Sequence, residues 1–171
     1  MTPDEFIKKI YPEAKHTDIN PVFVTAQAAL ESAWGAAAIG GTNLFGITKG
    51  SNWNGKTQLV LTTEYFKTNQ VKFALPEKAV RITPITATKY KYKVYRLFRV
   101  YPTISDCLID HTRILQKPGY ADAWPCRHDG YRFVKAISNS VGAKYATDPN
   151  YVKSMNSIML RVERTVQKLG I

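Results

Sequence analysis

The chain has 171 residues, of which 44% are hydrophobic and 22% charged, so it is long enough for one domain with a buried core and too apolar for a disordered tail. It has no run near the roughly 18 apolar residues of a membrane span, and no basic segment followed by an apolar one at its start, which predicts a protein without a membrane span or an export signal. Its 24 Lys and Arg outnumber its 13 Asp and Glu, and the excess lies mainly in residues 61–100, so we expect an anionic polymer or surface as a partner.

The cysteines and histidines give no sign of a metal site. Cys107 and Cys126 are too few for a disulfide framework, and the sequence has neither a C-x-x-C nor an H-E-x-x-H spacing. His16, His111 and His128 lie far apart in the chain. We therefore predict neither a metal ion nor another cofactor. Cys107 is expected to be buried, and Cys126 is expected either to be a free thiol or to pair with it.

Two helices are predicted in the first 35 residues. A Thr-Pro-Asp-Glu start beginning at Thr2 has the pattern of a capping box and predicts a short helix through Ile10. The pair Asn20-Pro21 repeats the start signal, and apolar residues then recur at helical spacing until Gly35. This second helix is apolar on most sides, which predicts a buried position.

A small basic β-lobe is predicted in the middle of the chain. After a loop rich in Gly and Asn over residues 40–55, β-branched and aromatic residues dominate Gln58–Phe66 and Lys89–Tyr101. We interpret these two runs as antiparallel strands. The connection over residues 67–88 is long for a tight hairpin, so it holds either a further strand or a mobile flap.

Three further helices are predicted after the β-lobe. Thr103 can cap one that runs to about Gln116, and residues 131–138 form a weak short one. Asp148, followed by Pro, starts a last helix that ends at Gly170.

These elements predict an α+β fold that is mostly helical. No internal repeat, low-complexity segment or second domain is evident in the sequence. The whole chain, residues 1–171, is therefore interpreted as a single domain with its β-lobe at about residues 58–101.

Glu31 is a candidate proton donor on the second predicted helix. Val24, Ala28 and Trp34 are assigned to the same face of that helix. Apolar neighbours desolvate a carboxyl group and raise its pKa, which suits it to donate a proton near neutral pH. The alternative is an ordinary solvated glutamate on a helix surface.

Glu64 is a candidate second acid, because it is one of only two acidic residues in the basic segment and lies in a strand-like run. If its strand faces the second helix, Glu31 and Glu64 border one groove, as the two carboxylates of glycosidases do. The alternative for Glu64 is an ion pair across the strands with one of the nearby cations.

Aromatic residues near the predicted loops are candidates for sugar binding. Tyr145, with Tyr151 nearby, can present a phenol to a groove, whereas Asp148 of the same segment is interpreted as a helix cap. Other aromatic residues suit either a carbohydrate cleft or the core, and these are Trp34, Phe45, Trp53, Tyr120 and Trp124.

Five segments in series carry a family resemblance, although each is weak alone. They are Ala26–Gly35, Asn43–Ile47, Thr62–Tyr65, Phe98–Pro102 and Tyr145–Tyr151. In this order, and over most of the chain, they resemble the glucosaminidase domains of glycoside hydrolase family 73, which include the peptidoglycan hydrolase domain of flagellar rod assembly and many autolysins.

The resemblance implies a lysozyme-like helical domain with a small basic β-hairpin lobe over the cleft. It implies cleavage of the β-1,4 bond between N-acetylglucosamine and N-acetylmuramic acid in peptidoglycan. Glu31 is similar to the general acid of the family, Glu64 to its second and more mobile acid, and Tyr145 to the tyrosine that supports the reacting sugar. The residues expected to contact the substrate are Trp34, Asn43, Phe45, Gly46, Tyr65, Tyr120 and Tyr151.

Two mechanisms stay open for such an enzyme. Either Glu64 activates a water, for which carboxylates about 6.5–9.5 Å apart leave room, or the acetamido oxygen of the substrate attacks. The basic connection over residues 67–88 is longer than the usual hairpin of the family, which bears on the position of Glu64. A lytic transglycosylase on a similar fold is the alternative enzyme. The alternative outside enzymes is a cationic module that binds cell wall or nucleic acid, because Lys89–Arg99 interleaves cations and aromatic residues.

The expected partners are peptidoglycan glycan strands, with anionic polymers of the cell envelope as further candidates. We expect the protein to be a monomer and to have no specific nucleic-acid partner. The chain is expected to act on the bacterial wall, in the periplasm or outside the cell, as a phage endolysin or a secreted lytic enzyme. It is expected to stay in the cytoplasm until another system releases or exports it.

Overall fold

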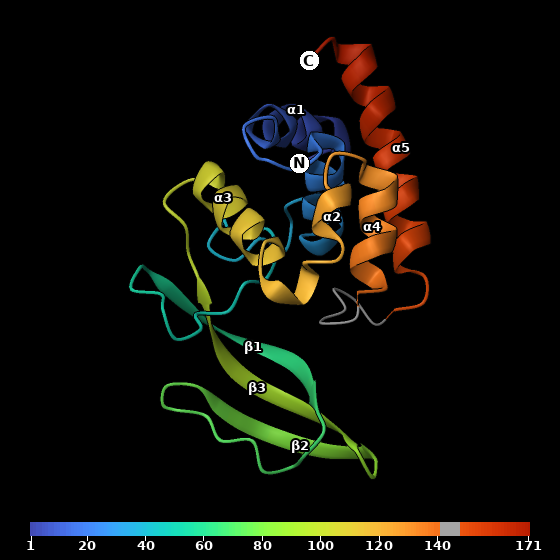
Figure 1. The fold of residues 1–171 in the computed structure, drawn as a ribbon. Helices are drawn as coiled ribbons and strands as arrows, with labels where there is room; N and C mark the ends of the chain where they lie inside the picture. The colour runs from blue at the N-terminus through green and yellow to red at the C-terminus, as the bar shows by residue number, and fades with distance from the viewer. Residues whose placement is uncertain (141–147) are drawn as a thin grey trace. The chain divides into compact units, whose positions relative to one another are not determined.

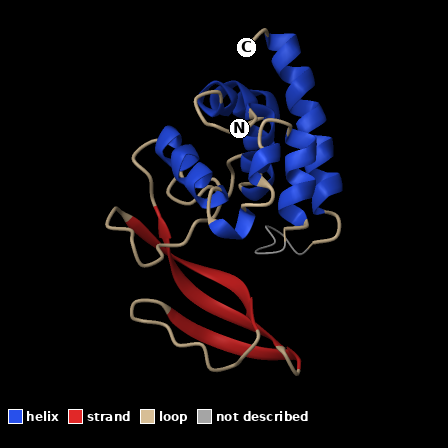
Figure 2. Ribbon diagram, in the orientation of Figure 1, coloured by secondary structure: helices blue, strands red, loops and turns tan. Residues whose placement is uncertain are grey.

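The computed structural model describes residues 1–140 and 148–171, which form two compact units. The first unit comprises Met1–Phe45 and Tyr101–Ile171 and holds the α-helices, whereas the second, Gly46–Val100, holds the β-strands (Figure 2). The predicted β-lobe lies almost entirely in the second unit, and the assignment of the whole chain to one domain stays a prediction. Among the described helices, none has both the length and the apolar character needed to cross a membrane.

The first helix, α1, spans Pro3–Ala14 (Figure 1). Its predicted capping box is confirmed, because the Thr2 hydroxyl accepts a hydrogen bond from the Glu5 backbone N–H and the Glu5 carboxylate accepts one from the Thr2 N–H. The helix runs one turn beyond its predicted end at Ile10. The buried Ala14 extends the apolar stripe of the helix past Pro12, so packing outweighs the helix-breaking tendency of proline.

The second helix, α2, spans Pro21–Glu31 and lies at the centre of the helical unit, where it contacts α1, α4 and α5. Phe23, Ala26 and Ala29 have no exposed surface, which confirms the buried position expected from its apolar sequence. The helix ends at Glu31 rather than at the predicted Gly35. The reason is a change of backbone direction at Ala33 and Trp34, which both have positive φ angles.

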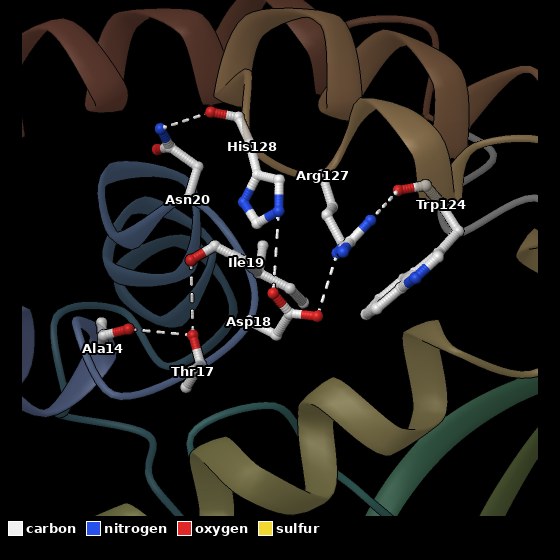
Figure 3. A network of polar contacts seen from close by, with 8 residues as sticks. All are labelled: Ala14, Thr17, Asp18, Ile19, Asn20, Trp124, Arg127 and His128. Carbon is white, nitrogen blue, oxygen red and sulfur yellow. Dashed lines mark hydrogen bonds and ion pairs between the residues drawn. The ribbon is translucent and has the colours of Figure 1, made fainter.

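The N-terminus of α2 is fixed by polar contacts to the segment before α4 (Figure 3). The Asn20 side-chain oxygen accepts a hydrogen bond from the Phe23 N–H at 3.0 Å and thereby caps the helix, as predicted. Its amide nitrogen donates to the His128 carbonyl at 3.1 Å, and its backbone N–H donates to the Arg127 carbonyl at 2.8 Å. Asp18 adds an ion pair to the Arg127 guanidinium at 3.1 Å. These contacts hold in place the helix that carries Glu31.

The remaining helices follow the predicted order and are α3 (Ile104–Leu115), η1 (Pro118–Tyr120), η2 (Trp124–Cys126), α4 (Gly130–Ser138) and α5 (Tyr151–Leu169). Thr103 caps α3 and Gly170 ends α5 in a left-handed conformation, both as predicted. The N-cap of α5 is Asn150 rather than the predicted Asp148. The Asp148 carboxylate instead accepts from the Asn150 N–H at 2.8 Å, which is a turn that precedes the helix.

Apolar side chains at helical spacing form the core of the helical unit. They come from every described α-helix and include Phe6, Phe23, Leu108, Phe133, Met155 and Met159. Cys107 is buried among them, and burial raises the pKa of its thiol to about 12. Both cysteines are free, so the alternative of a Cys107–Cys126 disulfide is wrong.

The second unit contains one antiparallel sheet in the order β1-β3-β2, formed by β1 (Thr57–Phe66), β2 (Lys78–Thr86) and β3 (Lys89–Arg99). The two predicted strands are β1 and β3, and they pair with each other. The predicted simple hairpin is incomplete, because the long connection contributes β2, which pairs with the other side of β3. Of the two alternatives for residues 67–88, the further strand is confirmed.

Candidate functional site

Glu31 is the last residue of α2, and its side chain is accessible to solvent. The surrounding protein atoms nevertheless raise the pKa of its carboxyl group above the ordinary value by desolvation. The group is thus both reachable by a large substrate and disposed to keep its proton. These are the two properties that a general acid requires.

The turn after Glu31 explains why the carboxyl group lies at a helix end. Ala33 and Trp34 have φ angles of 48° and 57°, and the Trp34 N–H donates to the Ala29 carbonyl at 2.8 Å. The Trp34 ring packs edge-on against Phe6 at 5.7 Å. The prediction that Trp34 shares a helix face with Glu31 is wrong, because the helix has ended before it. Its contact with substrate stays a prediction.

A buried polar chain links three helices beside Glu31. Gln27, one turn before Glu31 in α2, donates its side-chain N–H to the Tyr151 hydroxyl oxygen at 2.7 Å. Its side-chain oxygen lies 2.6 Å from Nε2 of His111 in α3. Because the Gln27 oxygen is the acceptor in this contact, His111 Nε2 carries the hydrogen. The His111 ring in turn stacks on Phe45 with ring centroids 3.8 Å apart.

The side chains of Gln27, His111 and Tyr151 in this hydrogen-bonded series stay uncharged. His111 is 1% exposed, and burial lowers the pKa of its imidazole to about 3. Its Nδ1 atom has no hydrogen-bond partner among the described residues. Burial is the main cause that raises the pKa of the Tyr151 phenol; the hydrogen bond from Gln27 opposes this shift, and electrostatic interaction with Glu31 and Tyr120 adds to it. The structure therefore brings Glu31, Tyr120 and Tyr151 within range of electrostatic interaction.

The loop after α2 carries three of the predicted substrate contacts, which are Asn43, Phe45 and Gly46. Asn43 is buried, and its side-chain oxygen accepts from the Phe45 N–H at 3.3 Å. Phe45 is 9% exposed and touches His111, so it connects this loop to the buried chain. Gly46 is exposed with φ of 60°. The two larger side chains thus shape the loop, and direct contact with substrate stays a prediction for all three.

Glu64 lies in β1 of the sheet unit, and Tyr65 points to the opposite face of the strand. The Glu64 carboxylate forms an ion pair with Arg96, which also pairs with Glu77. The predicted alternative of an ion pair across the strands is therefore confirmed, and the ion pair leaves a catalytic role untested. Tyr65 is 54% exposed, with the Lys89 ammonium 4.9 Å from its ring centroid. Tyr145 lies outside the described residues.

Gln27 and His111 are the residues that sequence reasoning missed. Gln27 precedes Glu31 by four residues in an otherwise apolar helix, which is a signal for a buried polar contact on the same side. His111 gave no such signal, because its partners are distant in the sequence. Among residues 1–140 and 148–171, no group of three His, Cys, Asp or Glu side chains could hold a metal ion, and cofactor independence stays a prediction.

Comparison with known families identifies the class of the protein. Residues 7–164 match the family described as mannosyl-glycoprotein endo-beta-N-acetylglucosaminidase. The chain belongs to this glucosaminidase family, glycoside hydrolase family 73, and is therefore a glycoside hydrolase. The family resemblance of the five sequence segments is thus confirmed.

Individual relatives agree with this assignment, and a solved structure shares the fold. The chain is 30% identical to the peptidoglycan hydrolase FlgJ of Pseudomonas aeruginosa, over 94% of this chain and 37% of that protein. It is 31% identical to a probable N-acetylmuramidase of Lactococcus lactis subsp. cremoris, over 95% of this chain and 34% of that protein. The glycoside hydrolase domain of Salmonella typhimurium FlgJ shares its fold, with a TM-score of 0.69 at 23% identity and coverage of 99% of this chain and 94% of that one. The chain spans about a third of the length of these two curated relatives.

Proposed function

We propose that this glycoside hydrolase cleaves peptidoglycan at the β-1,4 bond between N-acetylglucosamine and N-acetylmuramic acid, with Glu31 as the general acid. The observation that carries the proposal is the accessible carboxyl group of Glu31, whose pKa is raised by desolvation. A protonated Glu31 donates its proton to the glycosidic oxygen as the bond to the sugar breaks. The names of two relatives, peptidoglycan hydrolase and probable N-acetylmuramidase, support peptidoglycan as the substrate.

Tyr151 is proposed to assist Glu31. Because its hydroxyl oxygen accepts a hydrogen bond from Gln27, its own O–H is directed to another acceptor. A phenol held in this way can donate a hydrogen bond to the ionised Glu31 after proton transfer, or to a polar group of the sugar. Tyr145 keeps its proposed role of supporting the reacting sugar.

The test of Glu31 is the turnover of purified sacculi by Glu31→Gln. Gln is of similar size and cannot act as an acid, so we expect turnover to fall by about 10²–10⁴-fold with unchanged circular dichroism. Glu13→Gln, at an exposed position in α1, is the matched control and should keep full activity. An active Glu31→Gln protein would refute the assignment.

The products identify the bond. After borohydride reduction, mass spectrometry of the released fragments should show reduced N-acetylglucosamine at their ends. Reduced N-acetylmuramic acid would instead indicate a muramidase, in line with the name of the Lactococcus relative. Anhydro-muramyl ends would indicate a lytic transglycosylase. Either of these results would exclude the proposed bond while leaving Glu31 as the acid.

Glu64 is proposed as the second carboxylate, and its ion pair provides a matched control. Glu64 and Glu77 both bind Arg96, so removing either carboxylate disturbs the same guanidinium. Glu64→Gln should lower turnover well below that of Glu77→Gln if Glu64 acts in the reaction. Equal losses would show that both glutamates serve only the local structure. The configuration of the first product, followed by NMR, separates direct attack by water from attack by the acetamido group.

We propose that the chain acts at the cell wall, in the periplasm or outside the cell, as a phage endolysin or a secreted lytic enzyme. The test is the location of a tagged protein during growth and lysis of a host that expresses it. Tagged protein that never reaches the wall would oppose this role.

A further inference from the structure

Most of the positive charge of the chain belongs to the sheet unit. Residues 46–100 contain eleven Lys and Arg against two acids, whereas the rest of the chain contains thirteen against eleven. A segment of about a third of the chain therefore carries nearly all of the net charge of +11. The unequal distribution calls for a local explanation, since solubility alone does not require it.

One face of the sheet is covered and holds both acids. The connection between β1 and β2 places Phe73 against Phe66 and Tyr92, with ring centroids 6.0 and 6.2 Å apart. The Tyr92 hydroxyl donates to the Thr68 carbonyl at 2.7 Å, which fixes the same connection. Both acids of the unit, Glu64 and Glu77, pair with Arg96 on this side. Neither carboxylate is thus placed to neutralise the opposite face.

The opposite face of β2 and β3 presents like charges side by side. Arg81 is the register partner of Lys93, and Thr83 is the partner of Lys91. Like charges directly opposite each other in a sheet repel. A surface pocket of about 320 Å³ lies between these side chains and is lined by Arg81, Thr83, Ile85, Lys91 and Lys93. We call this the cationic groove.

We propose that the cationic groove binds a linear polymer of phosphodiester-linked polyols, which carries negative charge but no bases. Lys91 and Lys93 lie two residues apart on an extended strand, so their Cα atoms are about 6.6 Å apart, which suits successive charges along an extended polymer. An anion between Arg81 and Lys93 relieves their mutual repulsion. The choice of an envelope polymer rests on the proposed function, because such polymers accompany peptidoglycan in many bacterial walls.

The five lining residues themselves offer little to two other anionic partners. Single-stranded nucleic acid is bound largely by stacking its bases on aromatic side chains. None of the five lining residues is aromatic, and the nearest aromatic side chain on this face is on the neighbouring strand, where the exposed Tyr65 is the register partner of Lys91. An anionic membrane surface favours aromatic and aliphatic side chains that insert among the lipids, and Ile85 is the only apolar lining residue. The groove instead offers three cations and a hydroxyl group.

The experiment measures binding of fluorescently labelled poly(glycerol phosphate) by anisotropy over a series of salt concentrations. The variant carries Arg81→Gln, Lys91→Gln and Lys93→Gln, and the control carries Lys8→Gln, Lys9→Gln and Lys15→Gln in the helical unit, so both lose three charges. Release of counterions from three phosphate contacts predicts a loss of about 50-fold in affinity near 0.15 M salt, and a salt slope shallower by about 2. The control should bind within about twofold of the wild type.

Three outcomes would overturn the proposal. They are an unchanged affinity of the groove variant, an equal loss in the control, and tighter binding of an oligo(dT) or anionic phosphatidylglycerol vesicles than of the polymer. Hydrolysis of purified peptidoglycan that has been stripped of other polymers is measured in parallel. Loss of binding with hydrolysis retained supports the groove, whereas polymer binding without any hydrolysis refutes only the proposed function.

Discussion

Gln27 provides the sharpest test of how the candidate site is held together. It is completely buried and makes two hydrogen bonds, one to the Tyr151 hydroxyl at 2.7 Å and one to His111 Nε2 at 2.6 Å. Gln27→Leu keeps the approximate volume of the side chain but removes the hydrogen bonds to the Tyr151 hydroxyl and to His111 Nε2. His111 then has no described partner at either ring nitrogen, because its Nδ1 already lacks one.

The expected loss of stability follows from these two contacts. Each buried polar group left without a partner costs about 1–3 kcal/mol, and the apolar contacts of leucine offset part of the sum. We therefore expect Gln27→Leu to lower the free energy of unfolding by about 2–4 kcal/mol. In urea this corresponds to a midpoint lower by about 1–2 M, followed by circular dichroism.

A double-mutant cycle separates the hydrogen bonds from general damage to the core. His111→Phe replaces the imidazole with a ring that can still stack on Phe45, so the double variant removes both polar groups of the pair. We expect the double variant to be more stable than the sum of the single losses predicts, by about 1 kcal/mol or more. If the losses in free energy of unfolding of the two single variants simply add in the double variant, or if Gln27→Leu loses less than about 0.5 kcal/mol, the buried hydrogen bonds of Gln27 do not stabilise the fold as described.

Four further predictions follow from the same structure. Glu31 has a raised folded-state pKa, so turnover should fall as pH rises through that pKa, and Glu31→Gln should be more stable than the wild type above it and equally stable at about pH 3. His111 has a folded-state pKa lowered to about 3, so wild-type stability should fall by roughly 1 kcal/mol per pH unit below about pH 6.5, and His111→Phe should remove that slope in urea titrations. Asn20→Ala should lower stability by about 1–2 kcal/mol through loss of the cap and of the contact to His128, with Asn139→Ala, at the C-cap of α4, nearly neutral. Lys93→Thr should raise the melting temperature slightly, by relieving about 0.2–1 kcal/mol of repulsion with Arg81, whereas Lys72→Thr in the loop should not.

Local signals in the sequence predicted the elements of the fold well. The capping box at Thr2, the caps at Asn20 and Thr103 and the stop at Gly170 each depend on residues a few positions apart, and each is confirmed. The errors lie where distant packing decides. The sequence does not decide between a strand and a flap for β2, because Pro84 interrupts its strand pattern; in the structure two bulges adapt this strand to β3.

The candidate site was only partly predictable for the same reason. Glu31 could be singled out because Val24 and Ala28 precede it in its own helix, whereas Trp34 lies beyond the helix end. The chain from Gln27 to His111 and Phe45 spans separate elements, and the separations in sequence are 84 residues for the hydrogen bond and more than 60 for the stacked rings. No local pattern encodes such contacts, so the fold has to be known first.

The turn that ends α2 provides the last test, because it places Glu31 at a helix end by a backbone conformation that is unfavourable for most residues. Ala33 has a φ angle of 48°, which glycine adopts without strain and which β-branched residues resist. Ala33→Gly should therefore leave stability unchanged or raise it by up to about 1 kcal/mol, whereas Ala33→Val should lower it by about 1–3 kcal/mol. Thermal unfolding measures both. If the two variants have the same stability, the turn is not strained, and its backbone conformation does not explain why α2 stops at the candidate acid.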